Sequence, residues 1–463
     1  MLNHFNFKRF GKNEVLVTND FGRYEFLSDE QFRELALGRV VEGSSLWERL
    51  HKNRFLVDGF ETTSPEVIDD LRAMKSYLFS STALHIFVVT DVCNLSCIYC
   101  QAKDKINRPQ GYMTPEIGRK CIDMALQSPS KHLTFEFQGG EPLINFPVIK
   151  SMIEYSEEVR GEREIEYTVV SNLSLLTKEI LDFLLEHHVS ICTSLDGPED
   201  LHNRNRQCNI PDGSYALMKA GVEMINRRGF AVGGIETTTR HSLSRAKEIV
   251  RAYEEMGSPS VFLRPLTPLG FAKADWDKIG YTPAEYLAFY LEAFQEVLRI
   301  NKETRRFPEQ HATYFLSKIL GGYAQNYMEL RSPCGASVGQ LAYYYDGSIY
   351  TCDEARMVAE AGDSAFKLGD VFNSRYQDLV STGTCKATCV ASTIETIPGC
   401  CDCVYQPYCG VCPVVNYAHS GDIFPKSSRN YRCEIYGGML DYIFELLHEG
   451  DSETISILKS WVL

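Results

Sequence analysis

The sequence predicts an α/β protein built around a parallel sheet, and two observations lead to this expectation. Between residues 84 and about 270, six short runs of β-forming residues alternate with helical patterns. Several of these runs, such as IFVVT and LTFEF, consist almost entirely of apolar or β-forming residues, which is typical of strands buried on both faces. The pattern fits an open barrel or a doubly wound layer, and both place functional residues at the carboxyl ends of the strands.

Each expected strand is followed by a helical pattern or by a long connection that contains one. The six strands are expected at residues 84–89, 133–137, 165–170, 189–195, 231–237 and 260–263. The clearest helical patterns lie at residues 115–126, 177–187, 215–227 and 242–256.

Residues 1–80 are expected to form a small separate α+β unit, because short strand-like runs there are separated by turn residues. The first helix should begin after Ser28, since Gln31 follows at capping-box spacing, and should end at Gly38. The expected strands are residues 5–10, 15–18, 24–27 and 55–57, and the later helices are residues 46–51 and a segment that begins at Pro65.

The last third of the chain changes character at Cys334. Before it, residues 282–330 are expected to be helical with a break at Phe307 and Pro308. After it, the chain is rich in Cys, Gly and Tyr, so we expect a region with a small core that depends on metal for its fold. An amphipathic helix is expected at residues 436–448.

Composition restricts the class of protein. The chain has 463 residues, of which 44% are hydrophobic and 23% charged, an ordinary globular balance that excludes a disordered or fibrous chain. The formal charge of −14 disfavours nucleic acid and anionic membrane surfaces as partners. There is no apolar run of about 18 residues and no signal-peptide pattern at the start, so we expect no membrane span and a cytoplasmic protein.

The 16 cysteines are clustered, and in a reducing compartment clustered cysteines are expected to bind metal rather than to form disulfides. Ten lie between Cys334 and Cys433, and three form one tight group at residues 93–100. Of the other three, Cys121 and Cys192 are interpreted as small core residues and Cys208 as incidental.

The tight group, Cys93, Cys97 and Cys100, has C-x3-C-x2-C spacing directly after the first expected barrel strand. Three thiolates can hold three irons of a [4Fe–4S] cluster and leave the fourth iron open to chelate a small molecule. A structural zinc site is the alternative, but it requires four ligands, and no fourth Cys or His stands close by.

This motif, with an aromatic residue before the third cysteine, resembles that of radical S-adenosylmethionine (SAM) enzymes. Further segments resemble the family's motifs in the same order: the GGEP turn, which binds the SAM amino group, the ribose-facing VVSN segment, the TSLDGP strand end, and FLRPL beside the adenine. The residues that the resemblance implies to bind SAM are Tyr99, Gly139, Gly140, Glu141, Pro142, Ser171, Asn172, Ser194, Arg206 and Arg264.

The resemblance implies a partial (β/α)6 TIM-like barrel and a particular reaction. A reduced cluster cleaves SAM to methionine and a 5′-deoxyadenosyl radical, which removes a hydrogen atom from an unreactive C–H bond. The protein aims this radical and excludes water.

The cysteines after residue 334 resemble the SPASM pattern of auxiliary-cluster domains, although the last spacing, between Cys409 and Cys412, is two residues rather than the usual three. The resemblance implies two further [4Fe–4S] clusters, an inner one held by Cys334, Cys352 and Cys412 and an outer one held by Cys400, Cys403, Cys409 and Cys433. The inner cluster either has an open iron or takes a fourth ligand from Cys385, Cys389 or Cys401. Two zinc knuckles are the alternative.

Two more resemblances concern the substrate. Asp353 follows Cys352, at the place where sulfatase-maturing relatives have a proposed proton acceptor; a solvated or helix-capping role is the alternative. Residues 1–80 resemble the winged-helix-like domains that bind a leader peptide as an added strand. The segments LVTNDFGRYEFL, VFLRPLTPLGFA and PYCGVCP resemble most narrowly the radical SAM maturases of His-Xaa-Ser peptide systems.

The sequence therefore predicts a radical SAM/SPASM enzyme that modifies a ribosomally made precursor peptide by cross-linking or side-chain oxidation. It would use SAM, three [4Fe–4S] clusters and an electron donor such as flavodoxin or ferredoxin. The alternatives are a formylglycine-forming enzyme of the anaerobic sulfatase-maturase type and a zinc-binding interaction protein without catalysis. The expected domains are residues 1–80 for peptide recognition, 81–300 for the barrel, 301–333 for a helical bridge and 334–463 for the auxiliary-cluster region.

Overall fold

The computed structural model describes residues 1–58, 65–102, 111–322, 327–424 and 430–462. Six parallel strands form one side of a larger sheet and follow one another in chain order, as expected for a partial (β/α)6 barrel. They are β4 (Leu84–Val88), β6 (His132–Gln138), β7 (Glu164–Val170), β8 (Ser190–Ser194), β10 (Gly233–Thr237) and, at the edge of the sheet, β11 (Leu263–Arg264). The main helices between them are α4 (Pro115–Ala125), α5 (Phe146–Val159), α6 (Lys178–Glu186), α8 (Gly213–Asn226) and α9 (Ala246–Glu255).

Alternation along the strands separates the core from the barrel interior. In β6, Leu133, Phe135 and Phe137 are buried in the main apolar cluster, together with residues of α4 and α5. The intervening residues Glu136 and Gln138 are only partly buried and point into the barrel. Because successive side chains of a strand point to opposite faces, a packed outer face leaves polar side chains at the inner face.

The N-terminal unit is a three-stranded antiparallel sheet of β1 (Asn6–Phe10), β2 (Glu14–Thr18) and β3 (Tyr24–Ser28), followed by α1 (Asp29–Ala36), α2 (Ser45–Lys52) and α3 (Pro65–Met74). The capping box at the start of α1 is present, with Ser28 and Gln31 as its two members. The strand expected at residues 55–57 is wrong. Leu56 makes only an isolated bridge to Leu2, because the chain terminus runs beside it for too short a distance to build a ladder.

The C-terminal region continues the barrel sheet rather than forming a separate small core. β12 (Gln340–Tyr343) pairs in parallel with β4, and β13 (Ser348–Tyr350) and β14 (Lys367–Asp370) extend the sheet antiparallel. The helices that precede and follow these strands are α12 (Pro283–Glu303), α13 (Gln310–Leu320), α14 (Asp353–Glu360), α15 (Tyr376–Val380), α16 (Gly383–Ser392), α17 (Pro413–Ser420), α18 (Tyr431–Glu449) and α19 (Ser452–Ser460). The break at Phe307 and Pro308, between α12 and α13, is confirmed.

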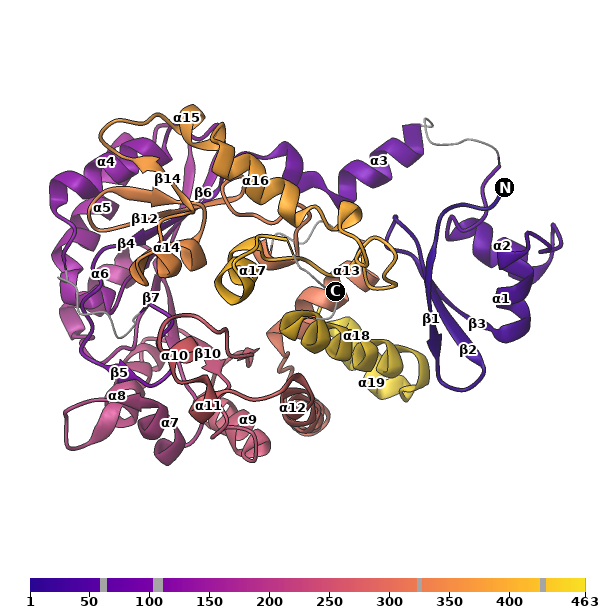
Figure 1. The fold of residues 1–463 in the computed structure, drawn as a ribbon. Helices are drawn as coiled ribbons and strands as arrows, with labels where there is room; N and C mark the ends of the chain where they lie inside the picture. The colour runs from indigo at the N-terminus through magenta and orange to yellow at the C-terminus, as the bar shows by residue number, and fades with distance from the viewer. Residues whose placement is uncertain (59–64, 103–110, 323–326, 425–429, 463) are drawn as a thin grey trace.

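The N-terminal sheet lies at the far end of the molecule from the barrel, with α18 and α19 between them (Figure 1). It is attached to the cysteine-rich region by specific contacts. The Asn6 amide donates to the carbonyl of Cys401 at 2.9 Å, and the Thr18 hydroxyl donates to that of Val404 at 2.7 Å. Phe26 stacks on His448 of α18 at 3.9 Å between ring centroids. One face of the N-terminal sheet is therefore a packing surface.

Within the described ranges, no helix combines the length and apolar character that crossing a lipid bilayer requires.

Candidate functional site

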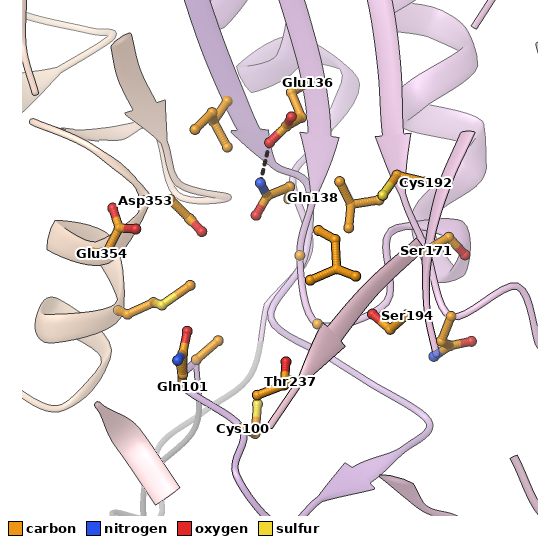
Figure 2. Close-up of a pocket in the computed structure, with 18 of the residues that line it drawn as sticks. Cys100, Gln101, Glu136, Gln138, Ser171, Cys192, Ser194, Thr237, Asp353 and Glu354 are labelled. Carbon is orange, nitrogen blue, oxygen red and sulfur yellow. Dashed lines mark hydrogen bonds between the residues drawn. The ribbon is translucent and has the colours of Figure 1, made fainter. Parts of the chain in front are cut away.

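A cavity of about 540 Å³ opens at the carboxyl ends of the barrel strands, a volume within the usual range for small-molecule sites. The three cysteines of the C-x3-C-x2-C group all line it, together with Gly139, Gly140 and Glu141 of the turn after β6. Figure 2 shows Cys100 and Gln101 at one end of the cavity and Glu136 at the other, while Asp353 and Glu354 lie across the cavity from Cys192 and Ser194.

The cysteine loop is fixed to the barrel by a short antiparallel ladder. β5 (Ser96–Cys97) pairs with β9 (Arg206–Gln207), so that Cys97 lies directly opposite Arg206. Burial raises the pKa of the Cys97 thiol to about 12, partly offset by the Arg206 charge; Cys100 and Cys93 raise it further. A thiol in this position forms a thiolate only beside a positive partner such as a metal centre.

A buried polar network supports this ladder. The Tyr99 hydroxyl donates to both oxygens of Asp196, at 2.7 and 3.0 Å. Arg206 donates through Nε to Asp196 at 3.2 Å, and its guanidinium lies 5.3 Å from the centre of the Tyr99 ring. Tyr99 and Arg206, both predicted to contact SAM, thus form with Asp196 one interlocked group directly beside Cys97.

The glycines of the turn after β6 allow it to pack directly on the cysteine loop. The Gly140 N–H donates to the Thr90 carbonyl and the Glu141 N–H to the Val92 carbonyl, both at 2.8 Å. A Cβ atom on Gly139 would lie 2.4 Å from the Thr90 carbonyl oxygen, and one on Gly140 would lie 2.2 Å from that of Val92. Any side chain here would displace the backbone that leads to Cys93.

Glu141 acts mainly on its own chain. Its carboxylate accepts hydrogen bonds from the Ser171 hydroxyl at 2.7 Å and from the backbone N–H of Asn172 at 2.8 Å and Leu143 at 3.0 Å. Burial raises its pKa to about 6, although these donors oppose the shift. Glu141 therefore joins the ends of β6 and β7 at the wall of the cavity.

The other predicted SAM contacts are distributed as follows. Ser171, Asn172, Ser194 and Arg264 line the cavity, as expected. The Arg264 guanidinium is already paired, donating to Glu329 at 3.0 Å. Pro142 is not among the cavity-lining residues; it is buried and begins the 3-10 turn Pro142–Asn145.

The cavity residues that were missed or misread from the sequence include Cys192, Glu136 and Glu354. Cys192, interpreted as a core residue, lines the cavity, because the side chain on β8 points to the barrel interior. Glu136 and Glu354 also line it, and burial raises the pKa of Glu136 to about 7. The signal for Glu136 was its place among the alternating residues of LTFEF; Glu354 offered none beyond its proximity to Asp353.

Asp353 lies in the cavity wall at the first turn of α14. Its carboxylate is paired with the buried Arg356, which donates through Nε at 3.1 Å and through a second nitrogen. Arg356 also donates to Glu360 at 3.0 Å. This pairing orients Asp353 while leaving it beside the cavity.

The predicted inner cysteines come together. Cys334, Cys352 and Cys412 are all buried in one apolar cluster, although 78 residues of sequence separate the first from the last. Burial raises the pKa of Cys412 to about 12, opposed by the charge of Arg432 and reinforced by Cys334. The pKa of Cys352 is raised by burial, by Glu354 and then by Cys412 and Cys334.

The predicted outer cysteines also form one group. Burial raises the pKa of Cys409 to about 12, and the nearby thiols of Cys403 and Cys433 raise it further. Burial also raises the pKa of the Cys400 thiol to about 12, and the nearby thiols of Cys433, Cys403 and Cys401 raise it further. Both predicted sets are therefore assembled from distant segments.

Within the described part of the chain, no three His, Cys, Asp or Glu side chains converge as they would around a single metal ion. The thiol sets fit iron–sulfur clusters, in which each thiolate binds a different iron. Positively charged Arg206 and Arg432 beside Cys97 and Cys412 suit the negative charge of such clusters.

Comparison with known proteins agrees with this geometry. Residues 87–241 match the family model described as the radical SAM superfamily. Over 371 residues, the chain is 22% identical to the cysteine-type anaerobic sulfatase-maturating enzyme of Clostridium perfringens (strain 13 / Type A), covering 77% of this chain and 94% of that protein.

Two solved structures are also similar. Native anSMEcpe with bound AdoMet matches with a TM-score of 0.68 at 20% identity, covering 82% of this chain and 99% of that one. Streptococcus suis SuiB bound to precursor peptide SuiA matches with a TM-score of 0.54 at 14% identity, covering 92% and 99%. The chain thus has the radical SAM α/β fold that the sequence predicted, and residues 87–241 are the part that matches the family model.

Proposed function

We propose that this protein is a radical SAM enzyme that modifies a ribosomally synthesised peptide, by cross-linking or by oxidation of a side chain. One observation carries the proposal: a single cavity is lined both by Cys93, Cys97 and Cys100 and by Asp353, which follows the inner thiol Cys352. In this proposal, the site for generating a radical and the site for completing the reaction share one cavity.

In this proposal the cysteine triad holds a [4Fe–4S] cluster, which when reduced supplies the electron that cleaves SAM to the 5′-deoxyadenosyl radical. The chain's own residues position SAM. The backbone of the turn at Gly139 and Gly140 faces its amino group, and Asn172, held at its N–H by Glu141, lies where the ribose is expected. Ser171, Ser194 and Arg264 complete the pocket wall.

Completion of the reaction requires loss of a proton from the substrate and a path for the remaining electron. Asp353 is proposed to take the proton, since Arg356 fixes one carboxylate oxygen and the cavity lies beside it. Cys334, Cys352 and Cys412 are proposed to hold the inner auxiliary cluster, and Cys400, Cys403, Cys409 and Cys433 the outer one. With the triad, this makes three [4Fe–4S] clusters.

The N-terminal unit is proposed to bind the precursor peptide, and the geometry favours the edge of β3. Hydrogen bonds at Asn19–Arg23 and Asn13–Asp29 flank the β2–β3 ladder. Because paired and outward-facing residues alternate in an antiparallel pair, the backbone groups of Tyr24 and Phe26 point away from β2. A groove of about 500 Å³ runs along this edge, lined also by Arg49. An added peptide strand fits there.

Three features support a peptide substrate: this groove, the likeness to SuiB bound to its precursor peptide, and the sequence resemblance to His-Xaa-Ser maturases. The second candidate is a formylglycine-forming maturase, favoured by the likeness to the cysteine-type sulfatase-maturating enzyme and by the position of Asp353. Either function requires an electron donor such as flavodoxin or ferredoxin.

The test is metal analysis and SAM cleavage on anaerobically purified protein. Three clusters predict about 12 irons per chain, whereas a zinc-binding protein would contain zinc without acid-labile sulfide. Replacing Cys93, Cys97 and Cys100 with Ala should remove about four irons and abolish 5′-deoxyadenosine formation. Cys208→Ala, which lies outside all three thiol sets, is the control. Reductive SAM cleavage by the triple variant would overturn the assignment.

A further inference from the structure

The inner thiol set has three cysteines, while a four-iron cluster has four corners. The remaining thiols of the C-terminal region are Cys385, Cys389 and Cys401. If one of these thiols binds the fourth iron, the inner cluster has no iron open to a substrate or an added molecule. If none does, one iron is open. The question rests on the proposed function, which assigns an iron–sulfur cluster to Cys334, Cys352 and Cys412.

One face of α16 packs against the loop that carries Cys334. Cys385, Thr388, Cys389 and Ser392 follow the i, i+3, i+4, i+7 spacing of a single helix face. The backbone N–H of Cys334 donates to the Ser392 hydroxyl at 3.0 Å. Cys334 therefore lies beside the C-terminal half of α16, at the level of Ser392 and of Cys389 three residues before it.

Hydrogen bonds distinguish the two thiols of this face. The Ser392 hydroxyl, which accepts from the backbone N–H of Cys334, donates to the carbonyl of Cys389 at 3.2 Å. Cys385 also lies one helical turn farther from Ser392. Cys389 is thus the α16 thiol next to the inner set.

Cys401 belongs to the other side of the region. Its thiol donates to the neighbouring Asp402 at 3.6 Å, and its carbonyl accepts from Asn6 of the N-terminal sheet. It acts on the pKa of Cys400, a member of the outer set. Its position is therefore wrong for the inner cluster.

A buried cation, Arg331, interacts through its charge with both Cys334 and Cys389. Arg331 is 2% exposed, and its guanidinium lies 4.4 Å from the centre of the Tyr77 ring. Burial lowers its pKa, and the groups that oppose this shift are Tyr77, Cys334 and Cys389. A guanidinium held near both sulfurs compensates the added negative charge of a fourth thiolate.

We propose that Cys389 is the fourth ligand of the inner cluster, with Cys334, Cys352 and Cys412 as the other three. The inner cluster then has four thiolate ligands and no iron open to substrate. A cluster held in this way would supply an electron acceptor beside the cavity but no iron site for the peptide. The fourth ligand then comes from α16, a helix that follows both Cys334 and Cys352 in the chain.

The test uses a background in which Cys93, Cys97 and Cys100 are replaced with Ala, so that only auxiliary clusters remain. The reduced protein is mixed with ¹³C-cyanide, a small ligand for an open iron, and examined by electron–nuclear double resonance for ¹³C coupling. We expect none in the background protein, coupling when Cys389→Ala is added, and none for the matched control Cys385→Ala from the same helix face.

Coupling already present in the background protein and unchanged by Cys389→Ala would show an open iron and overturn the proposal. So would coupling that appears only with Cys385→Ala. A second measurement avoids reliance on variants that fail to assemble: alkylation of native holoprotein followed by mass spectrometry. Cys389 should be protected until iron is removed, whereas Cys208 should react in both states. Alkylation of Cys389 in fully loaded protein would contradict ligation.

Failure of the underlying assignment is distinguishable. Cys352→Ala in the same background should lower the iron content by about four. If it retains all its iron, the inner cluster itself is absent from this site, and the assignment of Cys389 fails with it.

Discussion

The guanidinium of Arg206 lies beside the sulfur of Cys97, with Nη1 4.0 Å from Sγ. The two residues are direct partners in the β5–β9 ladder, and Asp196 holds the Arg206 side chain in place at 3.2 Å. A positive charge is thus fixed next to one proposed cluster ligand, in an interior where charge interactions are strong.

Removing this charge should lower the reduction potential of the cluster held by the triad. Net charge and hydrogen bonds at the ligand sulfurs tune such potentials. Arg206→Gln should therefore make this cluster harder to reduce, whereas Arg206→Lys, which keeps the charge, should shift it less. Redox titration followed through the electron paramagnetic resonance signal that changes on adding SAM measures the effect. Equal potentials in all three proteins would rule out this electrostatic role.

Gly140→Ala should impair assembly of the site without affecting distant parts of the fold. The added Cβ would lie 2.2 Å from the Val92 carbonyl oxygen, so the backbone before Cys93 must move. Overpacking of this kind typically costs about 1–3 kcal/mol. We expect lower iron content and weaker SAM binding. Gly437→Ala on α18, where the Cβ meets no atom within 4 Å, is the matched control. Similar behaviour of the two variants would contradict the close-packing explanation.

Asp353→Asn should separate radical formation from product formation. Asn keeps the shape of Asp and an oxygen for Arg356 but is not a base at neutral pH. The variant should retain its iron and form 5′-deoxyadenosine, yet modify about 10²–10⁴-fold less peptide. Mass spectrometry of the peptide and chromatography of the nucleoside measure both outputs. Full product yield with intact iron would show that another group takes the proton.

Glu136 should make stability depend on pH. Burial raises its pKa to about 7, so the folded state keeps a proton that the unfolded chain has lost. The contribution of Glu136 to the free energy of unfolding is greatest below its pKa in the unfolded chain, about 4.3. This contribution declines as pH rises through the folded-state pKa of about 7. Between about pH 6 and 8 the folded protein should lose roughly 1 kcal/mol from this group. Glu136→Gln should remove that part of the slope in anaerobic thermal unfolding. Parallel profiles of stability against pH for the unmodified protein and Glu136→Gln would refute this role of Glu136.

Tyr24→Pro should weaken precursor binding by removing an outward-facing N–H from the β3 edge. Tyr24 begins β3, a place where proline is tolerated in a strand. Arg9→Pro removes an outward N–H from the opposite edge, since the β1–β2 register leaves Arg9 facing away from β2. Affinity for the precursor should fall for the first variant and persist for the second. The reverse result would place the peptide on β1.

Local signals in the sequence were sufficient for much of the fold. The six barrel strands and the capping box of Ser28 and Gln31 depend on neighbouring residues, and short-range patterns identify them. The same holds for the cysteine triad and the Gly139–Gly140 turn, whose spacing itself carries the chemistry. The short strand expected at residues 55–57 was wrong, because whether such a run becomes a strand depends on a partner the local pattern does not reveal.

What only the tertiary structure decided involves residues far apart in the chain. Cys192 and Glu136 became cavity residues because the outer faces of their strands are packed against helices and their inner faces are not. Cys389 lies beside Cys334 because α16 folds back onto an earlier loop, which no spacing rule records. The sequence by itself determined which residues are candidates for binding iron and SAM, since that depends on residue type and local spacing. Packing decided which of them share one space, because proximity between distant segments is set by the whole core.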